Sequence, residues 1–290
     1  MKRFLLAFCG LWLAAAGNSL RAEEGFVTMF NGQDMTGWAG NPLLWSVRDG
    51  ALTGKTTPEN PAKENTFLIW TNGLPADFEM RCSFRIEANN SVGFANSGVQ
   101  YRSAIVKPSY WVMAGYQADM EAGKQYTGGL YEEKARGILA SRGDKVVVHP
   151  DGKIEKVGSL GDLNALENEI HHGDWNDYVI IAKGNHLQQF INGKAMVDFL
   201  DEQTDKAAAS GFIGLQLHAG QPMTVQFKDL RIKEDKTPKK IVFIAGTPSH
   251  GRGEHEYRAG CLLLEKCLQT VPGIETMVYS NGWPQAPGAL

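Results

Sequence analysis

Residues 188–199 read QQFINGKAMVDF, in which two alternating runs meet at Asn192 and Gly193. Asn-Gly between alternating hydrophobic residues is the strongest short-range signal for a two-residue β-hairpin. The preceding segment 177–183 (DYVIIAK) and the later segment 211–218 (GFIGLQLH) alternate in the same way. Short alternating runs separated by turn residues are typical of a sandwich or a barrel. We therefore expect a mainly β architecture around this hairpin.

The same pattern continues toward both ends of the chain, from about residue 26 to about residue 234. Further strands are expected at 43–48, 51–54, 66–70, 77–87, 96–103, 111–119, 186–191, 195–199 and 223–233. The charge-rich segment 127–144 (TGGLYEEKARGILASRGD) is expected to be a long surface loop. No internal repeat of fixed period interrupts this organisation.

The first 22 residues have the features of a secretory signal peptide. Lys2 and Arg3 precede an apolar run at 4–16, and Ala22 supplies a small residue for cleavage. The run is too short to span a bilayer, which needs about 20 residues. We expect a periplasmic or extracellular protein with no membrane span after signal removal. The formal net charge of −3 gives no basic footprint for nucleic acid.

The alternating pattern of the sequence ends near residue 235, where a charged segment begins. Residues 235–240 are expected to be a charged linker, and 241–290 follow a strand–loop–helix–strand pattern, the opening unit of an α/β domain. Such a unit cannot cover a parallel sheet on both faces, so we expect it to be incomplete. Its loop, 246–257 (GTPSHGRGEHEY), is rich in His and Glu and lies where ligands bind in a complete α/β domain, but with the rest of the sheet missing we expect no pocket on it. Cys82, Cys261 and Cys267 are expected to be free thiols.

Polar pairs at i and i+2 occur on three of the expected strands, and such residues share one face of a sheet. These pairs are Gln100 with Arg102, Gln117 with Asp119, and Gln216 with His218. The plain alternative is a solvated face, which every half-exposed antiparallel sheet has. Amide, guanidinium and carboxylate groups suit recognition of hydroxyls, however. Neighbouring aromatic residues, Tyr101, Tyr116, Trp111 and Tyr131, would offer stacking surfaces for sugar rings.

Glu132 and Glu133 form a pair of adjacent carboxylates near Arg136. Adjacent residues of an extended segment point to opposite sides, so at most one of the two should enter a given pocket. A solvated loop is the ordinary alternative for such a segment. His171 and His172 are expected to form a turn before the strand at 177–183.

With these residues described, a family resemblance becomes clear. The series FVTMFNGQDMTGW, WSVRDGALTG, DFEMRCSFRI, NSGVQYRS, GYQADM, GGLYEE, DWNDYVIIAKGNHLQQFINGK and IGLQLHAG resembles the bacterial 3-keto-disaccharide hydrolase-like domain. The resemblance runs from about Phe26 to Glu234, within an expected domain at 23–234, and implies a concanavalin A-like jelly-roll sandwich with a concave sugar-binding face. The segment from residue 241 resembles the start of trehalose-utilisation (ThuA-like) domains.

The resemblance also implies a reaction, the cleavage of glycosides whose sugar is oxidised at C3. A C3 ketone acidifies the C2 proton, so a base can remove it and the glycosidic oxygen can leave from C1. Water addition then completes a net hydrolysis. This chemistry needs a base, an acid for the leaving group and donors to the enolate oxygen. A divalent metal is one option for assisting enolate formation.

We expect a glycoside or oligosaccharide as substrate and assign roles accordingly. Asp119 or His218 is the candidate base, and Glu132 or Glu133 is the candidate acid. The remaining candidates are expected to bind the substrate; they are Gln100, Arg102, Gln117, Tyr101, Tyr131, Arg136 and Gln216. The alternative reading is a non-catalytic carbohydrate-binding sandwich attached to a ThuA-like domain, because jelly rolls do both jobs.

Overall fold

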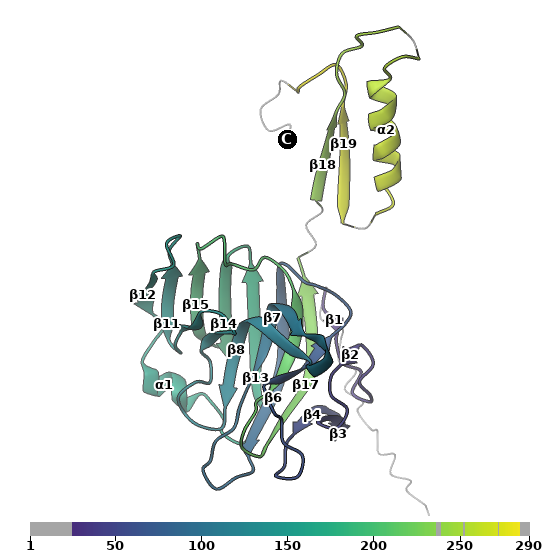
Figure 1. Cartoon of the computed structure of the whole chain (residues 1–290). Helices are drawn as coiled ribbons and strands as arrows, with labels where there is room; N and C mark the ends of the chain where they lie inside the picture. The colour runs from purple at the N-terminus through teal and green to yellow at the C-terminus, as the bar shows by residue number, and fades with distance from the viewer. Residues whose placement is uncertain (1–24, 236–238, 252, 272, 285–290) are drawn as a thin grey trace, which may run out of the picture.

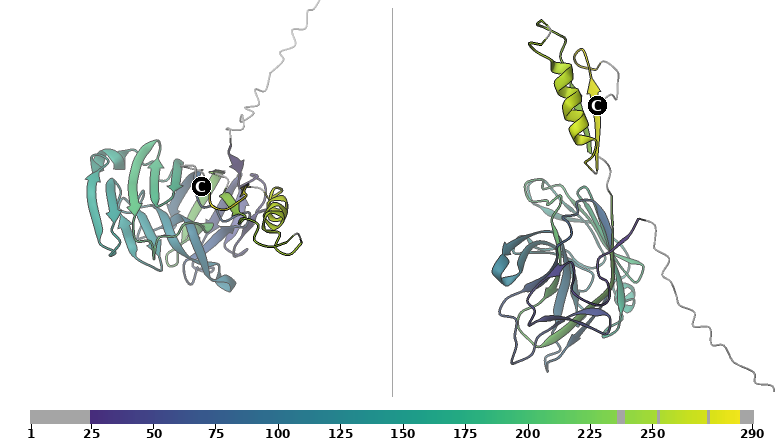
Figure 2. Two further views of the ribbon diagram at one scale, coloured as in Figure 1. Left: turned by 90° about the horizontal axis from the view of Figure 1, so that it is seen from above. Right: turned by 90° about the vertical axis from the view of Figure 1, so that its right-hand side faces the viewer.

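The computed structural model describes residues 25–235, 239–251, 253–271 and 273–284. The expected signal peptide, 1–22, lies outside the described residues, as does part of the expected linker. From Val27 to Glu234 the chain folds into two mostly antiparallel sheets that lie face to face (Figures 1 and 2). The prediction of a mainly β jelly-roll sandwich is confirmed.

The larger sheet has ten strands and the smaller sheet has seven. In order across the larger sheet these are β12 (Ile154–Ser159), β11 (Asp144–Val148), β15 (Lys194–Asp201), β14 (His186–Ile191), β13 (Asn176–Lys183), β6 (Phe78–Ala88), β17 (Met223–Glu234), β4 (Ala51–Lys55) and β3 (Trp45–Arg48), with β1 (Val27–Thr28) paired to β17. In order across the smaller sheet they are β10 (Gly137–Ala140), β9 (Leu130–Glu133), β8 (Val112–Glu121), β7 (Asn96–Lys107), β16 (Phe212–Leu217), β5 (Thr66–Trp70) and β2 (Trp38–Ala39). The short helix α1 (Leu163–Asn168) joins β12 to β13, with Asp162 as its N-cap.

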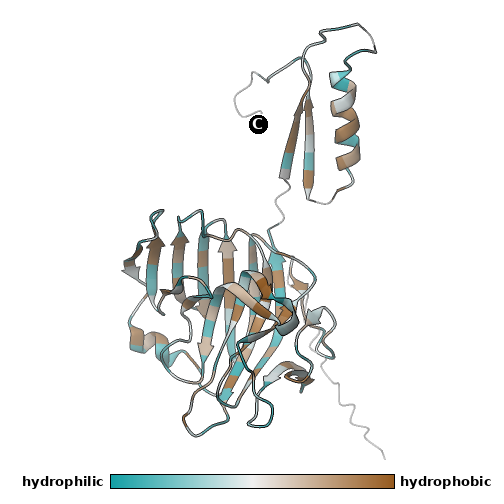
Figure 3. Ribbon diagram, viewed as in Figure 1, coloured by the Kyte–Doolittle hydropathy of each residue, from teal (hydrophilic) through white to brown (hydrophobic). Residues whose placement is uncertain are grey.

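The Asn192-Gly193 hairpin forms as predicted, between β14 and β15. Ile191 pairs with Lys194 across it, and Asn192 and Gly193 have φ values of 49° and 78°. Positive φ at both central residues is the type I′ turn that this dipeptide favours. Buried and more exposed residues alternate along β14, so that one row of side chains lies between the sheets and the other outside. Hydrophobic and hydrophilic bands alternate along the strands in Figure 3.

The core lies between the two sheets and is built from the inward-facing residues of both. Tyr101 of the smaller sheet packs edge-on against Phe78 of the larger sheet, with ring centroids 6.1 Å apart. Phe84 and Tyr178 pack together within the larger sheet at 5.6 Å. All four residues are almost fully buried. The opposite, outer face of the smaller sheet is the one that bears the polar residues of interest.

Residues 127–144 were expected to be a loop, and this expectation is wrong. They contain the β9–β10 hairpin, which extends the smaller sheet by two strands. The turn residues Lys134 and Gly137 both have positive φ. Of these two, only glycine is a residue type that suggests positive φ, so little in the sequence indicates a tight turn here.

The far end of the β7–β8 pair folds back over the outer face of the smaller sheet; we call residues 103–114 the β7–β8 arm. Register shifts interrupt the pairing after Tyr101 and after Ile105, which marks β-bulges. At the tip of the arm, the 3₁₀ turn Pro108–Tyr110, the Tyr110 carbonyl accepts from Thr66 Oγ1 at 3.0 Å. Phe67 N donates to Trp111 O at 2.9 Å. The arm is thereby fastened to the start of β5.

A second, smaller hydrophobic cluster holds the arm on this face. Met113 of the arm packs with Phe67 and Ile69 of β5, and all three are buried. Gly214 is required beneath it, because a Cβ there would collide with Met113 Sδ. The arm thus covers part of the outer face and leaves the part near β8 and β9 as the candidate site.

Beyond residue 239 the chain forms a separate strand–helix–strand unit. β18 (Lys239–Ile244) and β19 (Ile274–Tyr279) pair in parallel, and α2 (Tyr257–Leu268) connects them. The predicted order of elements is present. The helix buries none of its residues, and Leu263 is 63% exposed. The ThuA-like resemblance of this segment stays a prediction.

Candidate functional site

Alternation along β8 separates core residues from site residues. Tyr116, Ala118 and Met120 point into the core, so Gln117 and Asp119 point to the outer face of the sheet. The register places Asp119 of β8 opposite Gly98 of β7. On the other side of Gly98, the register of β16 continues to Gln216. The two predicted pairs, Gln117–Asp119 and Gln216–His218, therefore share one face.

The side chain of Gln117 lies across Gly98, where a Cβ would collide with it. Gln117 Nε2 donates to Asp119 Oδ1 at 2.7 Å, and Gln117 Oε1 accepts from Gln216 Nε2 at 3.0 Å. Gln100 Nε2 lies 3.5 Å from the same Oε1. We call Gln100, Gln117 and Gln216 the amide cluster. All three are buried. Their hydrogen bonds join Gln100 and Gln216 to Gln117, and Gln117 to Asp119.

Asp119 is the group with the most unusual environment. It is 8% exposed, and burial raises the pKa of its carboxyl to about 7. The hydrogen bond from Gln117 works in the opposite direction, whereas the nearby carboxylates of Glu121 and Glu133 raise the pKa further. A carboxyl that titrates near neutrality can both accept and return a proton at physiological pH.

Glu133 and Tyr131 of β9 lie on the same face as Asp119. Tyr131 pairs with Gln117 across the sheet, and the charges of Glu133 and Asp119 contribute to a raised pKa of Tyr131 after burial. Asn65 Nδ2 lies 3.4 Å from both oxygens of Glu133. The site thus combines two carboxyl groups and a phenol.

His218 lies further along this face, past Gln216. Its Nδ1 lies 2.6 Å from Ala219 O, and its ring packs edge-on against Phe94 with centroids 5.5 Å apart. The Ala219 N–H is held by Asn65 Oδ1 at 3.0 Å. No hydrogen bond joins His218 to Asp119. Of the two candidate bases, Asp119 is the one that is buried, accepts a hydrogen bond from Gln117 and has a raised pKa.

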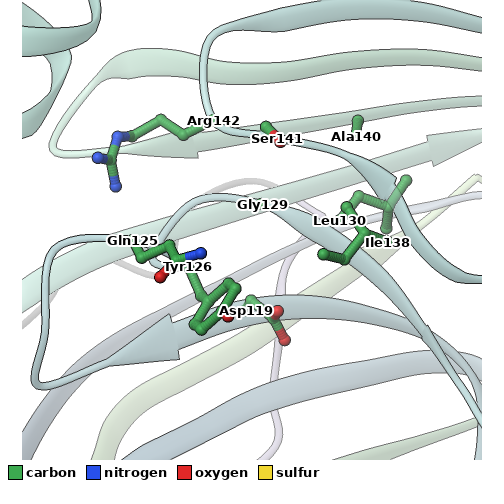
Figure 4. A pocket seen from close by; sticks show the side chains of 9 residues that line it. All are labelled: Asp119, Gln125, Tyr126, Gly129, Leu130, Ile138, Ala140, Ser141 and Arg142. Atoms are coloured by element: carbon green, nitrogen blue, oxygen red, sulfur yellow. The ribbon is translucent and has the colours of Figure 1, made fainter.

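A small hollow, open to solvent, lies beside Asp119 (Figure 4). In Figure 4 the ring of Tyr126 lies next to the Asp119 carboxyl. The hollow is lined by Asp119, Gln125, Tyr126, Gly129, Leu130, Ile138, Ala140, Ser141 and Arg142. Because Ile138 pairs with Tyr131, it belongs to the same outer face.

Arg102 does not lie with Gln100, contrary to expectation. It has a φ of 46° at the bulge in β7, which breaks the alternation and turns its side chain away. Its guanidinium donates to Gly184 O at 2.5 Å and to Asp77 Oδ1 at 2.9 Å. Burial lowers its pKa, and the charge of Asp77 opposes that change. Arg102 therefore connects the two sheets.

Tyr101 is likewise not available to a sugar. It is fully buried between the sheets and stacks on Tyr116, with ring centroids 5.8 Å apart. The error arose because adjacent strand residues face opposite sides, and Gln100 occupies the outer side.

Glu132 and Glu133 do point to opposite sides, as predicted, and Glu132 is the one that leaves the site. Arg136 Nε donates to Glu132 Oε2 at 2.5 Å, and Arg136 Nη2 donates to Asp201 Oδ2 at 2.7 Å. Tyr116 donates to the same Asp201 oxygen at 2.5 Å. Burial alone would lower the pKa of Arg136, but its two carboxylate partners raise it. Glu132 and Arg136 thus form a network that ties the β9–β10 hairpin to the end of β15.

Sequence reasoning missed several residues that shape the site, namely Asn65, Gly98, Glu121 and Tyr126. Each acts through a contact that depends on strand order or on the shape of one loop. Only Gly98 left a local signal, as a glycine inside an expected strand, which often marks close approach of another group.

Three further expectations concern metals, thiols and membranes. Within the described ranges, no group of three or more His, Cys, Asp or Glu side chains is placed to hold a metal ion. Cys82, Cys261 and Cys267 are free. None of the helices among the described residues is long and apolar enough to cross a membrane.

Comparison with known families gives one decisive match. Residues 25–233 match the model of the 3-keto-alpha-glucoside-1,2-lyase-like domain. The chain belongs to this family. The match covers the whole sandwich, including the amide cluster and Asp119, and it confirms the resemblance inferred for this part of the sequence. Family membership indicates a carbohydrate-active domain. A search of curated proteins found no match.

Solved structures with similar folds share little sequence with this family member. A candidate glycosyl hydrolase from Parabacteroides distasonis is 18% identical, with 73% of this chain and 94% of that chain covered and a TM-score of 0.47. The carbohydrate-binding module CBM66 from Bacillus subtilis is 14% identical, with coverages of 68% and 96% and a TM-score of 0.44. A Bacillus subtilis protein of unknown function with a galectin-like fold is 11% identical, with coverages of 69% and 90% and a TM-score of 0.46.

Proposed function

We propose that this protein cleaves 3-keto-glycosides, with Asp119 as the base that removes the C2 proton. The observation that supports this role is the Asp119 carboxyl, buried at the edge of a hollow, fixed by Gln117 and titrating near pH 7. A base is most effective when its pKa lies near the working pH. The C3 ketone makes the C2 proton acidic enough for a carboxylate to remove.

The reaction proceeds in two balanced stages. Asp119 takes the proton from C2, and the C2–H electron pair moves into an enolate with its charge on the C3 oxygen. The enolate then re-forms the C3 carbonyl as the C1–O bond breaks, which leaves a C1–C2 double bond and a leaving-group oxygen. That oxygen takes a proton from an acid of the site. Addition of water at C1 and of a proton at C2 completes the hydrolysis.

Glu133 is the candidate acid in this scheme. It lies on the same face as Asp119, whereas Glu132 is paired with Arg136 on the other side of the strand. Glu133 is buried, at 8% exposed, and lies near enough to Asp119 for its charge to help raise the pKa of that carboxyl. The Tyr131 phenol lies between them in register and is a donor for the C3 oxygen.

The test is release of the leaving group from matched substrates. We expect the full chain to release nitrophenol from nitrophenyl 3-keto-glucosides, tested as both anomers, and to leave the unoxidised nitrophenyl glucosides intact. Asp119→Asn should lower the rate by at least about 100-fold, since general base catalysis typically contributes that much. His218→Ala is the matched variant, because His218 is the alternative base on the same face. If Asp119 is the base, His218→Ala should release nitrophenol at close to the wild-type rate. Binding of both substrates without release would instead identify a carbohydrate-binding module.

A further inference from the structure

We propose that the hollow beside Asp119 is a subsite for the leaving group and that it selects an aromatic one. This inference rests on the proposed function, because it assigns the hollow beside Asp119 to the leaving group of a glycoside. The amide cluster lies on one side of Asp119 across β7 and β16. The hollow lies on the other side, toward β9 and β10 (Figure 4).

The walls of the hollow are about half apolar and half polar. The Tyr126 ring and the Ile138 side chain are exposed, at 36% and 57%, and Leu130 and Ala140 line the hollow between them as buried residues. Ile138 is an exposed aliphatic residue on the same face as the polar site, where nothing in the described residues covers it. A flat apolar group placed here would contact both Tyr126 and Ile138.

The loop that bears Tyr126 is fixed from two sides. The Glu121 carboxylate accepts from Tyr126 N at 2.7 Å and also from Gln125 N. Arg142 donates to Thr127 O at 2.7 Å and to Lys124 O at 2.9 Å. The Tyr126 ring is therefore presented on a preorganised loop, which lowers the entropy cost of binding against it.

The same contacts use part of the hydrogen-bonding capacity near the hollow. Two nitrogens of Arg142 are committed to the loop, and Nη2 also pairs with Glu167 at 2.6 Å. The polar groups left near the hollow are those of the exposed residues Gln125, Ser141 and Tyr126, the Asp119 carboxyl and the buried Arg142 Nε, which has no hydrogen-bond partner among the described residues. A second sugar ring brings several hydroxyls that need partners once water is displaced, whereas an aromatic ring brings none. The chemistry of the hollow thus favours an aryl group over a second sugar.

A binding measurement with unreactive ligands tests this subsite without requiring turnover. Phenyl glucoside, methyl glucoside and a glucose disaccharide would be titrated into the full chain by calorimetry, with each glucoside used as both anomers. We expect phenyl glucoside to bind roughly tenfold more tightly than methyl glucoside, the ratio that corresponds to one aromatic contact. Tyr126→Ala and Ile138→Asn should each reduce this ratio to near one. Tyr110→Ala is the control, because Tyr110 is an exposed tyrosine on the β7–β8 arm.

The outcomes separate the two proposals. A phenyl preference that disappears in Tyr126→Ala supports the subsite even if no glycoside is cleaved, and that combination would overturn only the proposed function. A phenyl-to-methyl ratio unchanged by Tyr126→Ala and Ile138→Asn would overturn the subsite. Tighter binding of the disaccharide than of phenyl glucoside, lost in Tyr126→Ala, would overturn its aromatic selectivity. Thermal unfolding at the wild-type temperature confirms that these surface variants are folded.

Discussion

Replacing Asp119 with asparagine should lower turnover by at least about 100-fold and at the same time stabilise the folded protein at alkaline pH. The folded-state pKa of Asp119, about 7, lies above its ordinary value of 3.8. Between these two values the folded protein holds a proton that the unfolded chain has released. Stability therefore falls as the pH rises through this window, and the full cost is present above about pH 7.

The size of the effect follows from the shift. One pKa unit corresponds to 1.36 kcal/mol, so ionising Asp119 in the folded state costs at most about 4 kcal/mol. Asparagine avoids this cost and keeps an oxygen that can accept from Gln117 Nε2. We expect the variant to be more stable than wild type by about 2–4 kcal/mol at pH 8 and by less than about 1 kcal/mol near pH 4.5.

Urea denaturation followed by tryptophan fluorescence at the two pH values measures this difference. The control is Asp205→Asn, at an exposed aspartate, which should stay within about 0.5 kcal/mol of wild type at both pH values. A stability difference for Asp119→Asn that is absent at pH 8, or equal at the two pH values, would refute the assignment of a raised pKa. Catalysis by Asp119 would then lose its physical basis.

Three other variants test the environment of the site. Gly98→Ala should displace the side chain of Gln117, which lies across Gly98. Because the hydrogen bond from Gln117 lowers the pKa of Asp119, the midpoint of the pH–rate profile should rise. An unchanged midpoint would contradict this packing. Arg102→Met should destabilise the protein by about 2–3 kcal/mol in urea without changing KM, since its charged hydrogen bonds serve the fold. Glu133→Gln should lower kcat by about 100-fold with little loss of stability. Glu132→Gln should leave kcat nearly unchanged and lower the free energy of unfolding by about 2 kcal/mol. Equal effects of the two variants would contradict their placement on opposite faces.

Local patterns in the sequence predicted much of the sandwich. Alternation identified the long strands, and Asn192-Gly193 identified a hairpin whose backbone angles match the dipeptide. The same alternation correctly put Gln117 and Asp119 on one face. These successes share a cause, since side-chain direction in a regular strand depends only on position along it.

The failures came where the strands are irregular or where contacts are long in sequence. Arg102 was misplaced because a bulge reverses its direction, and a non-glycine residue at positive φ leaves no trace in sequence. Asn65 reaches Glu133 across 68 positions of the chain, a contact that depends on the folded arm and not on a motif. Tyr126 went unnoticed because its importance comes from how Glu121 and Arg142 fix its loop.

Exchange with solvent deuterium shows whether Asp119 removes the C2 proton of a 3-keto-glycoside. A 3-keto-glucoside would be incubated in deuterium oxide with the full chain, with Asp119→Asn and without protein, and C2 of the products followed by NMR. We expect the sugar released by the wild-type chain to contain deuterium at C2, and we expect exchange with Asp119→Asn to be no greater than in the protein-free control. Release of a sugar that keeps its original C2 hydrogen, or full exchange by Asp119→Asn, would contradict this role of Asp119.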